Sequence, residues 1–258
     1  MPEGLEAEIY RRAAAAAVGR TVGSVVVDDR QVTADAIRSE LPGQRIAAVG
    51  RHGKVVVVRG DGVDLGLHFG MTGRLVVDDR AAIDQLAYSS GRDAPQWDRL
   101  VIGFAEGGSL RVNDPRRWAR FDLDPDLSHL GPDVLDAARG DGLRDAIAAA
   151  LRGSRPLKAV LLDQSRLAGL GNMSADEVMF QAGVAPAVPA GEVSADGIDR
   201  LTAAIRTHLP AMLARGGSHT GELDPDRRAR LPPCPHDGTP LVRSVVCSRT
   251  TVWLSLIH

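Results

Sequence analysis

The feature of this sequence that most constrains its fold is a change of hydrophobic periodicity near residue 125. Before it, short apolar runs alternate with turn signals such as Gly60-Asp-Gly62, a pattern typical of strands. From Asp133 onward, apolar residues recur at helical spacing. Pro125, Gly131 and Pro132 lie between the two patterns and indicate a linker. We therefore expect two domains of different structural class.

The first part predicts an antiparallel β-sandwich preceded by one helix. The helix is expected from Leu5 to Val18, because this stretch is Ala-rich and stops at Gly19. The strand-like runs have no helical pattern between them and lie at 22–27, 45–49, 54–58, 63–67, 74–77, 100–104, 109–112 and 119–123. Residues 80–97 are acidic and polar, and we expect a long mobile loop there.

The second part predicts a helical domain that ends in a small hairpin. Helices are expected at 133–139, 141–152, 156–163, 173–182 and 194–214, and strand-like runs at 240–246 and 249–254. The stretch between them, 216–233, is polar and Arg-rich. The expected fold is thus a multi-domain α+β protein. It comprises a β-sandwich domain (1–124), a linker (125–132), a helical domain (133–231) and a β-hairpin finger (232–258).

Composition narrows the class of protein. No run of 18 apolar residues occurs, and the start has no signal-peptide pattern, so we expect no membrane span and a cytoplasmic protein. Two cysteines, Cys234 and Cys247, predict no disulfide framework. The net charge of −2 mildly opposes wholesale nucleic-acid binding. Lys54 and Lys158 are the only lysines, and Arg, the better bidentate phosphate ligand, supplies the other positive charges.

The arginines gather in two groups, at 111, 116, 117 and 120, and at 227, 228, 230, 243 and 249.

The first residues of the chain could take part in covalent catalysis. Removal of Met1 would leave Pro2 with a secondary α-amine, a group whose reference pKa is about 7.7–8.0, so that it is partly unprotonated near neutral pH. Attack of this amine on an aldehyde-level carbon gives an iminium, and the neighbouring Glu3 could move the protons. Glu6 is a second acid nearby. The alternative is that these residues only start a helix, with acids at its positive end.

Two predicted turns carry residues suited to intrusion into a duplex. Residues 68–74 place Met71 at a turn, where it could wedge into a base stack, although core filling is the alternative. Residues 113–118 place Arg116 beside Trp118. Arg can replace the hydrogen bonds of a flipped base while Trp stacks. The alternative is a solvated turn with a packed Trp.

A third turn lies between two predicted helices. It runs from Ala168 to Asn172 and is rich in Gly. Backbone N–H groups at the start of the second helix, with the Asn172 amide, would suit a phosphate. The alternative is that Asn172 only caps the helix.

Together these motifs resemble the formamidopyrimidine-DNA glycosylase / endonuclease VIII (Fpg/Nei) family. The matching pieces stand in family order and span nearly the whole chain: Met1-Pro-Glu-Gly4, Lys54, His68-Phe-Gly-Met-Thr-Gly73, Asn113-Asp-Pro-Arg-Arg117, Leu130-Gly-Pro-Asp133, Leu162-Asp-Gln164, Ala168-Gly-Leu-Gly-Asn172 and Arg249-Thr-Thr251. The resemblance implies an N-terminal β-sandwich, a helix-two-turns-helix DNA-binding domain and a β-hairpin finger.

The resemblance also implies a function, that of a bifunctional DNA glycosylase and AP lyase of base excision repair. Pro2 would be the nucleophile at C1′ of the damaged nucleotide, Glu3 the proton-transfer partner and Glu6 a supporting acid. Phosphates would be held by Lys54, His68, Asn172 and Arg249, and the space left by the flipped base would be filled by Met71, Arg116 and Trp118. The partner implied is damaged double-stranded DNA, with no cofactor, and we expect a monomer in the cytoplasm, associated with the nucleoid.

The sequence departs from the family in its finger. The family's usual zinc ligands fall on Cys234, Asp237, Leu254 and Ile257, of which two are apolar. A tetrahedral zinc site needs N or S donors, so we predict a zincless finger with no metal. A rival set with unfamiliar spacing consists of Cys234, His236, Cys247 and His258.

Other departures concern the substrate. Leu5 replaces a usual Pro, and Ser174 replaces a usual Tyr. The short stretch 216–233, with Gly4, favours an endonuclease VIII-like member that acts on oxidised pyrimidines or open sites. The set of residues that would fill the flipped-base space resembles the other branch, which leaves the lesion open.

Two alternatives to the enzyme remain. One is a non-catalytic or weakly catalytic binder of abasic or kinked DNA. The other is an unrelated two-domain protein with a different ligand, which only the acidic pI favours.

Overall fold

The computed structural model describes residues 2–84, 86, 91–234 and 236–254. The chain divides into two compact units. The first comprises Pro2 and Glu6–Leu127, and the second comprises Glu3–Leu5 and the chain from Ser128 onward. Each unit has its own hydrophobic core.

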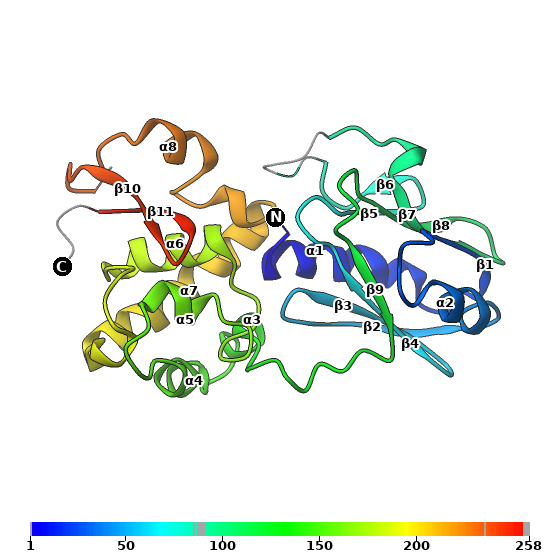
Figure 1. Ribbon diagram of the computed structural model, residues 1–258, viewed down its shortest axis with the longest axis horizontal. Coiled ribbons are helices and arrows are strands. Elements are labelled where there is room, and N and C mark those ends of the chain that lie inside the picture. Colours follow the sequence, from blue (N-terminus) through cyan, green and yellow to red (C-terminus); the bar gives the residue numbers. More distant parts are fainter. Residues whose placement is uncertain (1, 85, 87–90, 235, 255–258) are drawn as a thin grey trace. The chain divides into compact units, whose positions relative to one another are not determined.

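The first unit contains two antiparallel sheets and, from Glu6 onward, the helix α1 (Gly4–Ala14), which ends in a short 3₁₀ turn (Ala15–Ala17). One sheet has the order β1-β7-β8-β5-β6 and the other β2-β3-β4-β9 (Figure 1). The strands are β1 (Val22–Val27), β2 (Ile46–His52), β3 (Val55–Gly60), β4 (Asp64–His68), β5 (Arg74–Val77), β6 (Arg80–Ala81), β7 (Asp98–Phe104), β8 (Ser109–Asn113) and β9 (Arg120–Leu123). The predicted sandwich with an N-terminal helix is confirmed.

The core of this unit lies between the two sheets and under α1. Val56 and Leu67 from one sheet and Leu75 from the other are fully buried in it, as alternating strands require. Tyr10 on α1 is also buried, its ring is 4.4 Å from that of Phe69, and its hydroxyl donates to Gly73 O at 3.1 Å. The helix is thereby fixed to the turn that follows β4.

A buried ion pair fixes the same helix to β2. Glu8 on α1 accepts hydrogen bonds from Arg11 at 2.9 Å and from Arg12 at 3.0 Å, and Arg51 lies 3.4 Å away. Burial works to raise the pKa of Glu8, but the hydrogen bonds from these arginines outweigh it and lower the pKa to about 2. The carboxylate therefore stays charged throughout the physiological range.

The first unit departs from the sequence expectation in two places. A helix, α2 (Ala34–Glu40), lies between β1 and β2, where only strands were expected. It is short, but it buries Ile37, and the next turn places Leu41 on the same face. The segment 80–97, expected as a mobile loop, contains β6 and a 3₁₀ turn at Pro95–Trp97.

The end of that segment is held firmly. Arg74 donates to Gly91 O at 2.7 Å, and Asn113 donates to Ala94 O at 2.8 Å. Arg111 pairs with Asp93 at 2.9 Å and with Asp98 at 3.1 Å. Residues 85 and 87–90, also part of the expected loop, lie outside the described residues.

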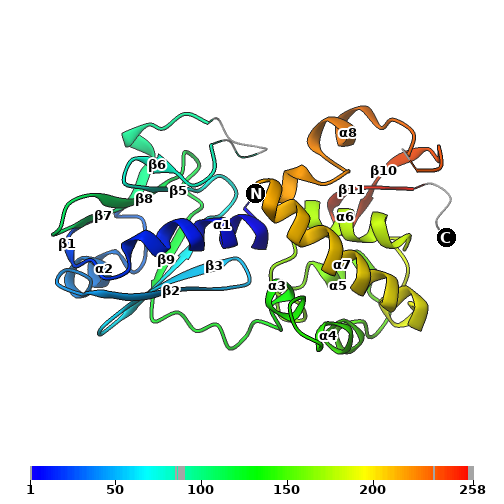
Figure 2. The same cartoon turned by 180° about the vertical axis from the view of Figure 1, so that it is seen from behind.

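The second unit is helical, as expected. Its helices are α3 (Val134–Ala137), α4 (Leu143–Ala150), α5 (Leu157–Leu161), α6 (Asn172–Ala182), α7 (Ala195–Arg215) and α8 (Pro225–Arg230), with 3₁₀ turns at Ala190–Glu192 and Ser218–Thr220. The strands β10 (Leu241–Val246) and β11 (Arg249–Leu254) pair as the predicted antiparallel hairpin. In both views β11 lies beside α6, on which it packs (Figures 1 and 2).

Helix α8 was not expected within the polar stretch 216–233. It begins with a standard signal, since the Asp224 side chain accepts from Arg227 N at 2.8 Å and Pro225 occupies the first turn. The buried carboxylate of Glu177 on α6 anchors the chain just before it by accepting from Leu223 N at 2.8 Å. The stretch is therefore ordered and tied to the helical core.

Candidate functional site

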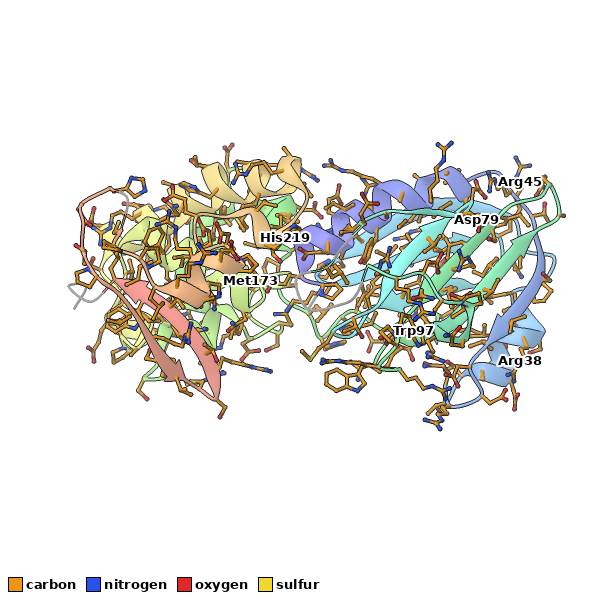
Figure 3. The ribbon with its side chains drawn as sticks, turned by 90° about the horizontal axis from the view of Figure 1, so that it is seen from above. Arg38, Arg45, Asp79, Trp97, Met173 and His219 are labelled. Atoms are coloured by element: carbon orange, nitrogen blue, oxygen red, sulfur yellow. The ribbon has the colours of Figure 1, made fainter. Side chains whose placement is uncertain are left out.

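The carboxylate of Glu3 is held at the N-terminus of α6. Its two oxygens accept from Met173 N at 2.9 Å and from Ser174 N at 3.0 Å (Met173 is labelled in Figure 3). The Ser174 hydroxyl donates to the same carboxylate at 2.5 Å. Glu3 is 1 % exposed. Unpaired N–H groups at a helix start favour an anion, so this geometry holds Glu3 in one orientation.

Glycines allow Glu3 and the start of the chain to lie this close to the Gly-rich turn before α6. A Cβ on Gly171 would meet the Glu3 side chain at 2.2 Å, so any larger residue there would displace the carboxylate. Gly4 N donates to Gly169 O at 2.8 Å, and a Cβ on Gly4 would lie 2.8 Å from that same oxygen. Leu5, which follows, is buried in the core of the second unit. The Gly-rich turn and the start of the chain therefore fit each other at backbone level.

The other two predicted catalytic residues belong to the first unit. Pro2 directly precedes the clamped Glu3 in the chain. Glu6 lies in the first turn of α1 and is 2 % exposed. Burial, together with the nearby charge of Glu6, raises the pKa of Tyr10 well above its ordinary value. Their catalytic roles stay predictions.

Lys54 and His68 are brought close together by strand pairing. Lys54 lies in the tight turn between β2 and β3, and the next residue, Val55, pairs with His68 on β4. Burial, with the positive charges of Arg120 and Lys54, lowers the pKa of His68 to about 4. Its Nδ1 accepts from Gly70 N at 3.2 Å, so neutral His68 carries its proton on Nε2, ready to donate to an anion.

Arg120 is a second positive group at this place, beside Lys54. It pairs directly with His68 across β4 and β9, so their side chains lie on one face of the sheet. The sequence placed Arg120 in an arginine group but gave it no role. The missing information was the register between two strands that are far apart in the chain.

The turns that carry Met71 and Trp118 are joined by one aspartate. Asp114 has no exposed area, and its carboxylate accepts from the Thr72 hydroxyl and from the backbone N–H of residues 116, 118 and 119. A Cβ on Gly70, which has φ of +58°, would meet Trp118 O at 2.5 Å. Close backbone packing and one buried carboxylate thus bring the two predicted stretches together.

The two turns differ in the exposure of their large side chains. Trp118 is 50 % exposed, and the guanidinium of Arg116 lies 5.5 Å from the centre of its ring. Met71 is partly buried. A stacked cation and aromatic on an exposed turn can present a flat surface to a base. The alternative of a fully packed Trp does not fit the exposure of Trp118.

The second unit carries the remaining predicted contacts, Asn172 and Arg249. The cap of α6 is Gly171, so the alternative role of Asn172 as the helix cap is wrong. Asn172 Nδ2 donates to Thr250 O at 3.1 Å. Arg249 is exposed and begins β11, after a two-residue turn in which Cys247 and Ser248 both have positive φ. Asn172 therefore contacts the hairpin just beyond Arg249.

Not every clustered arginine is available for phosphate. Arg111 is surrounded by Asp79, Asp93 and Asp98, at distances of 2.9–3.3 Å (Asp79 is labelled in Figure 3). Arg228 is buried against Asp176 at 2.8 Å. Clustering along the sequence did not separate these structural arginines from the exposed ones.

The finger shows no metal-binding cluster within the part of the chain that the structure describes, where no three His, Cys, Asp or Glu side chains gather. Cys234 is buried in a small apolar core with Phe180, Leu223, Leu241 and Val252. Cys247 is exposed on the hairpin turn. Ile257 and His258, members of the two ligand sets considered, lie outside the described residues. The absence of zinc stays a prediction.

Known proteins resemble this chain over most of its length. The family model for the formamidopyrimidine-DNA glycosylase N-terminal domain matches residues 1–121, and that for the H2TH domain of the same enzyme matches residues 130–223. The formamidopyrimidine-DNA glycosylase of Stenotrophomonas maltophilia (strain R551-3) is 33% identical, over 99% of this chain and 98% of that protein.

Solved structures share the fold. The MutM (Fpg) protein from Thermus thermophilus is 30% identical with a TM-score of 0.77, covering 98% of this chain and 97% of that one. The Lactococcus lactis Fpg in complex with abasic-site DNA has a TM-score of 0.81 at 21% identity and covers 99% of both chains. This second likeness concerns the fold alone.

Proposed function

Because the chain belongs to the formamidopyrimidine-DNA glycosylase family, we propose that it excises oxidised bases as a DNA glycosylase of base excision repair and also cuts the strand as an AP lyase. The observation that carries the proposal is the clamped carboxylate of Glu3. It is fixed by three hydrogen bonds and directly follows Pro2, the residue whose α-amine would act as nucleophile. A fixed acid beside an amine suits proton transfer during covalent catalysis.

The chemistry would proceed from the N-terminus. After removal of Met1, the Pro2 amine attacks C1′ of the damaged nucleotide, and Glu3 moves the protons as the base leaves. The resulting iminium acidifies the 2′ proton, whose loss eliminates the 3′ phosphate and cuts the strand. Lys158 is an unsuitable rival amine, because it has no exposed side-chain area and forms an ion pair with Asp176. Lys54 is the other lysine.

DNA would be held by groups from both units. We propose that Lys54, His68, Asn172 and Arg249 bind phosphates, and that Met71, Arg116 and Trp118 fill the space of the flipped base. The neutral His68 would act as a hydrogen-bond donor rather than as a cation, because of its low pKa. The exposed Trp118 with its stacked Arg116 supports the base-filling role.

The lesion class follows from the stretch 216–233. We propose oxidised pyrimidines or open sites, because the stretch is short and is tied down by Glu177 and Asp176, which leaves little chain to cover a flipped purine.

The partner is damaged double-stranded DNA, bound by a monomer without a cofactor, in the cytoplasm at the nucleoid. No helix in the described ranges is long and apolar enough to cross a membrane.

The test is borohydride trapping on an oligonucleotide with one abasic site. The protein is first checked by mass spectrometry for loss of Met1. Wild type should form a covalent adduct and cut the strand. Pro2→Gly should lose most or all of the adduct, and Glu3→Gln should slow both steps. Tight binding by wild type without adduct or cutting would instead support a non-catalytic binder of abasic DNA, and absence of binding would refute a role on DNA.

A further inference from the structure

Three charged side chains are buried together in the second unit. Lys158 on α5 and Asp176 on α6 have no exposed side-chain area, and Arg228 on α8 is 8% exposed. Lys158 Nζ lies 2.7 Å from one oxygen of Asp176, and Arg228 Nη2 donates to the other at 2.8 Å. One carboxylate therefore joins three helices through two cations. We call this set the ionic cluster.

The ionic cluster also contacts the backbone of the hairpin. Lys158 Nζ donates to Thr250 O at 3.0 Å and to the Thr251 hydroxyl at 2.8 Å. Val252 N donates to Asp176 at 3.2 Å. These three residues follow Arg249 directly, so the cluster contacts β11 immediately beyond this exposed arginine.

The three N–H donors of Lys158 make this contact with the hairpin specific. An ammonium group has three N–H donors, and here they face Asp176, Thr250 and Thr251. If the hairpin moved away, two of these donors would lose their acceptors, Thr250 O and the Thr251 hydroxyl. Burial lowers the pKa of Lys158 below its ordinary value, although the nearby charge of Asp176 opposes the shift.

The hairpin needs such an anchor, because its apolar support is small. Two strands alone are only marginally stable in water. The apolar core beneath them consists of Phe180, Leu223, Cys234, Leu241 and Val252. Within the described residues no set of metal ligands gathers at the hairpin to hold it.

We infer that Lys158, Asp176 and Arg228 are positioning residues that fix the hairpin to α5, α6 and α8 and so present Arg249 to DNA. The structural part of this inference stands on the contacts of the cluster. The part that concerns Arg249 rests on the proposed function.

The first experiment measures hydrogen–deuterium exchange of the full-length protein. Asp176→Asn removes the charge but keeps the size, and leaves two buried cations without a counter-ion. Amides of β11 should exchange about a hundredfold faster. The matched control is Asp226→Asn on α8, whose ion pair with Arg230 is exposed and should leave exchange unchanged. A chelator added to wild type should also change nothing, and chelator-induced loosening of β11 would overturn the inference.

A second variant keeps the test decisive if Asp176→Asn does not fold. Thr251→Val preserves shape but removes one acceptor of Lys158 on the hairpin side. It should speed exchange of β11 about tenfold, with little change in α7. Unchanged exchange in both folded variants would refute the cluster as the anchor.

The link to Arg249 is tested by binding to a duplex that carries a tetrahydrofuran abasic analogue. Asp176→Asn and Arg249→Ala should each weaken binding about tenfold, and the double variant should be little weaker than either. Fully additive losses would show that the cluster does not act through Arg249. If wild type binds no such DNA, the proposed function fails, whereas the exchange experiment still decides the structural part.

Discussion

Each unit supports one exposed segment on a buried aspartate, but the two aspartates are held differently. In the first unit, Asp114 accepts from three backbone N–H groups of its own turn and from the Thr72 hydroxyl. In the second unit, Asp176 is held by Lys158, Arg228 and the backbone of Val252. One carboxylate is thus solvated by neutral dipoles and the other by cations.

The two aspartates differ in how far along the chain their partners lie. Most donors to Asp114 lie within five residues of it, so the turn that carries Arg116 and Trp118 contains most of its own support. The partners of Asp176 come from elements up to 76 residues away. Loss of Asp114 should therefore disturb one turn, whereas loss of Asp176 should disturb several helices and the hairpin together.

The largest effect expected is that of Asp176→Asn on stability. Removal of one partner from a buried ion cluster typically costs about 3–5 kcal/mol, because the remaining charges stay buried. Urea denaturation followed by tryptophan fluorescence, to which Trp253 on β11 contributes, measures the loss. Asp226→Asn should cost less than about 0.5 kcal/mol. A cost for Asp176→Asn below about 1 kcal/mol would mean that the ions contribute little.

Asp114→Asn should have a smaller effect, about 2–3 kcal/mol. The amide keeps one acceptor oxygen but turns an NH₂ group towards backbone donors, which leaves some of them unsatisfied. Trp118 emission and urea denaturation follow the loss. The matched control is Asp124→Asn, since Asp124 accepts an exposed hydrogen bond from Asp64 N, at 2.9 Å, and Asn tolerates its positive φ. Equal costs in both variants would contradict the anchoring role of Asp114.

The sequence was informative where periodicity decides the structure. The strands predicted at 74–77 and 249–254 agree with the observed bounds, because alternation and turn residues mark them locally. The helix α2 was missed since it is only seven residues long and its apolar face consists of Ile37 and Leu41. Such a pattern is too short to separate a helix from a loop.

The anchors of the site could not be predicted, because they depend on tertiary contacts. From the sequence, Lys158 is visible only as one of the two lysines, yet it is buried and holds the hairpin. Asp114 was visible as part of a motif, but its contact with Thr72 spans 42 residues. Ser174 was noted only as a departure from the family, and its hydrogen bond to Glu3 spans 171.

The pH dependence of stability tests the contribution of His68 to the first unit. Its pKa is about 4 when folded and about 6.5 when unfolded, so the unfolded chain takes up a proton first as the pH falls. The stability that neutral His68 supplies is complete above about pH 6.5 and is lost towards pH 4. Between pH 7 and pH 5 the loss should be about 2 kcal/mol. His68→Gln should lack this component of the pH dependence in urea denaturation, and an unchanged dependence would show that His68 is not the group responsible.

Ser174 offers the finest comparison, because it supports Glu3 as Thr72 supports Asp114. In each case a hydroxyl and backbone N–H groups hold a buried carboxylate. Ser174→Ala removes the hydroxyl but leaves both N–H donors, so Glu3 should stay in place with a looser orientation. We expect a loss of about 1 kcal/mol in the transition state, or about fivefold in kcat for strand cutting at an abasic site, with KM nearly unchanged. Ser174→Thr keeps a hydroxyl and should retain most of the rate. A rise in KM with constant kcat would instead place Ser174 in DNA binding, because loss of binding that is equal in the ground and transition states raises KM alone.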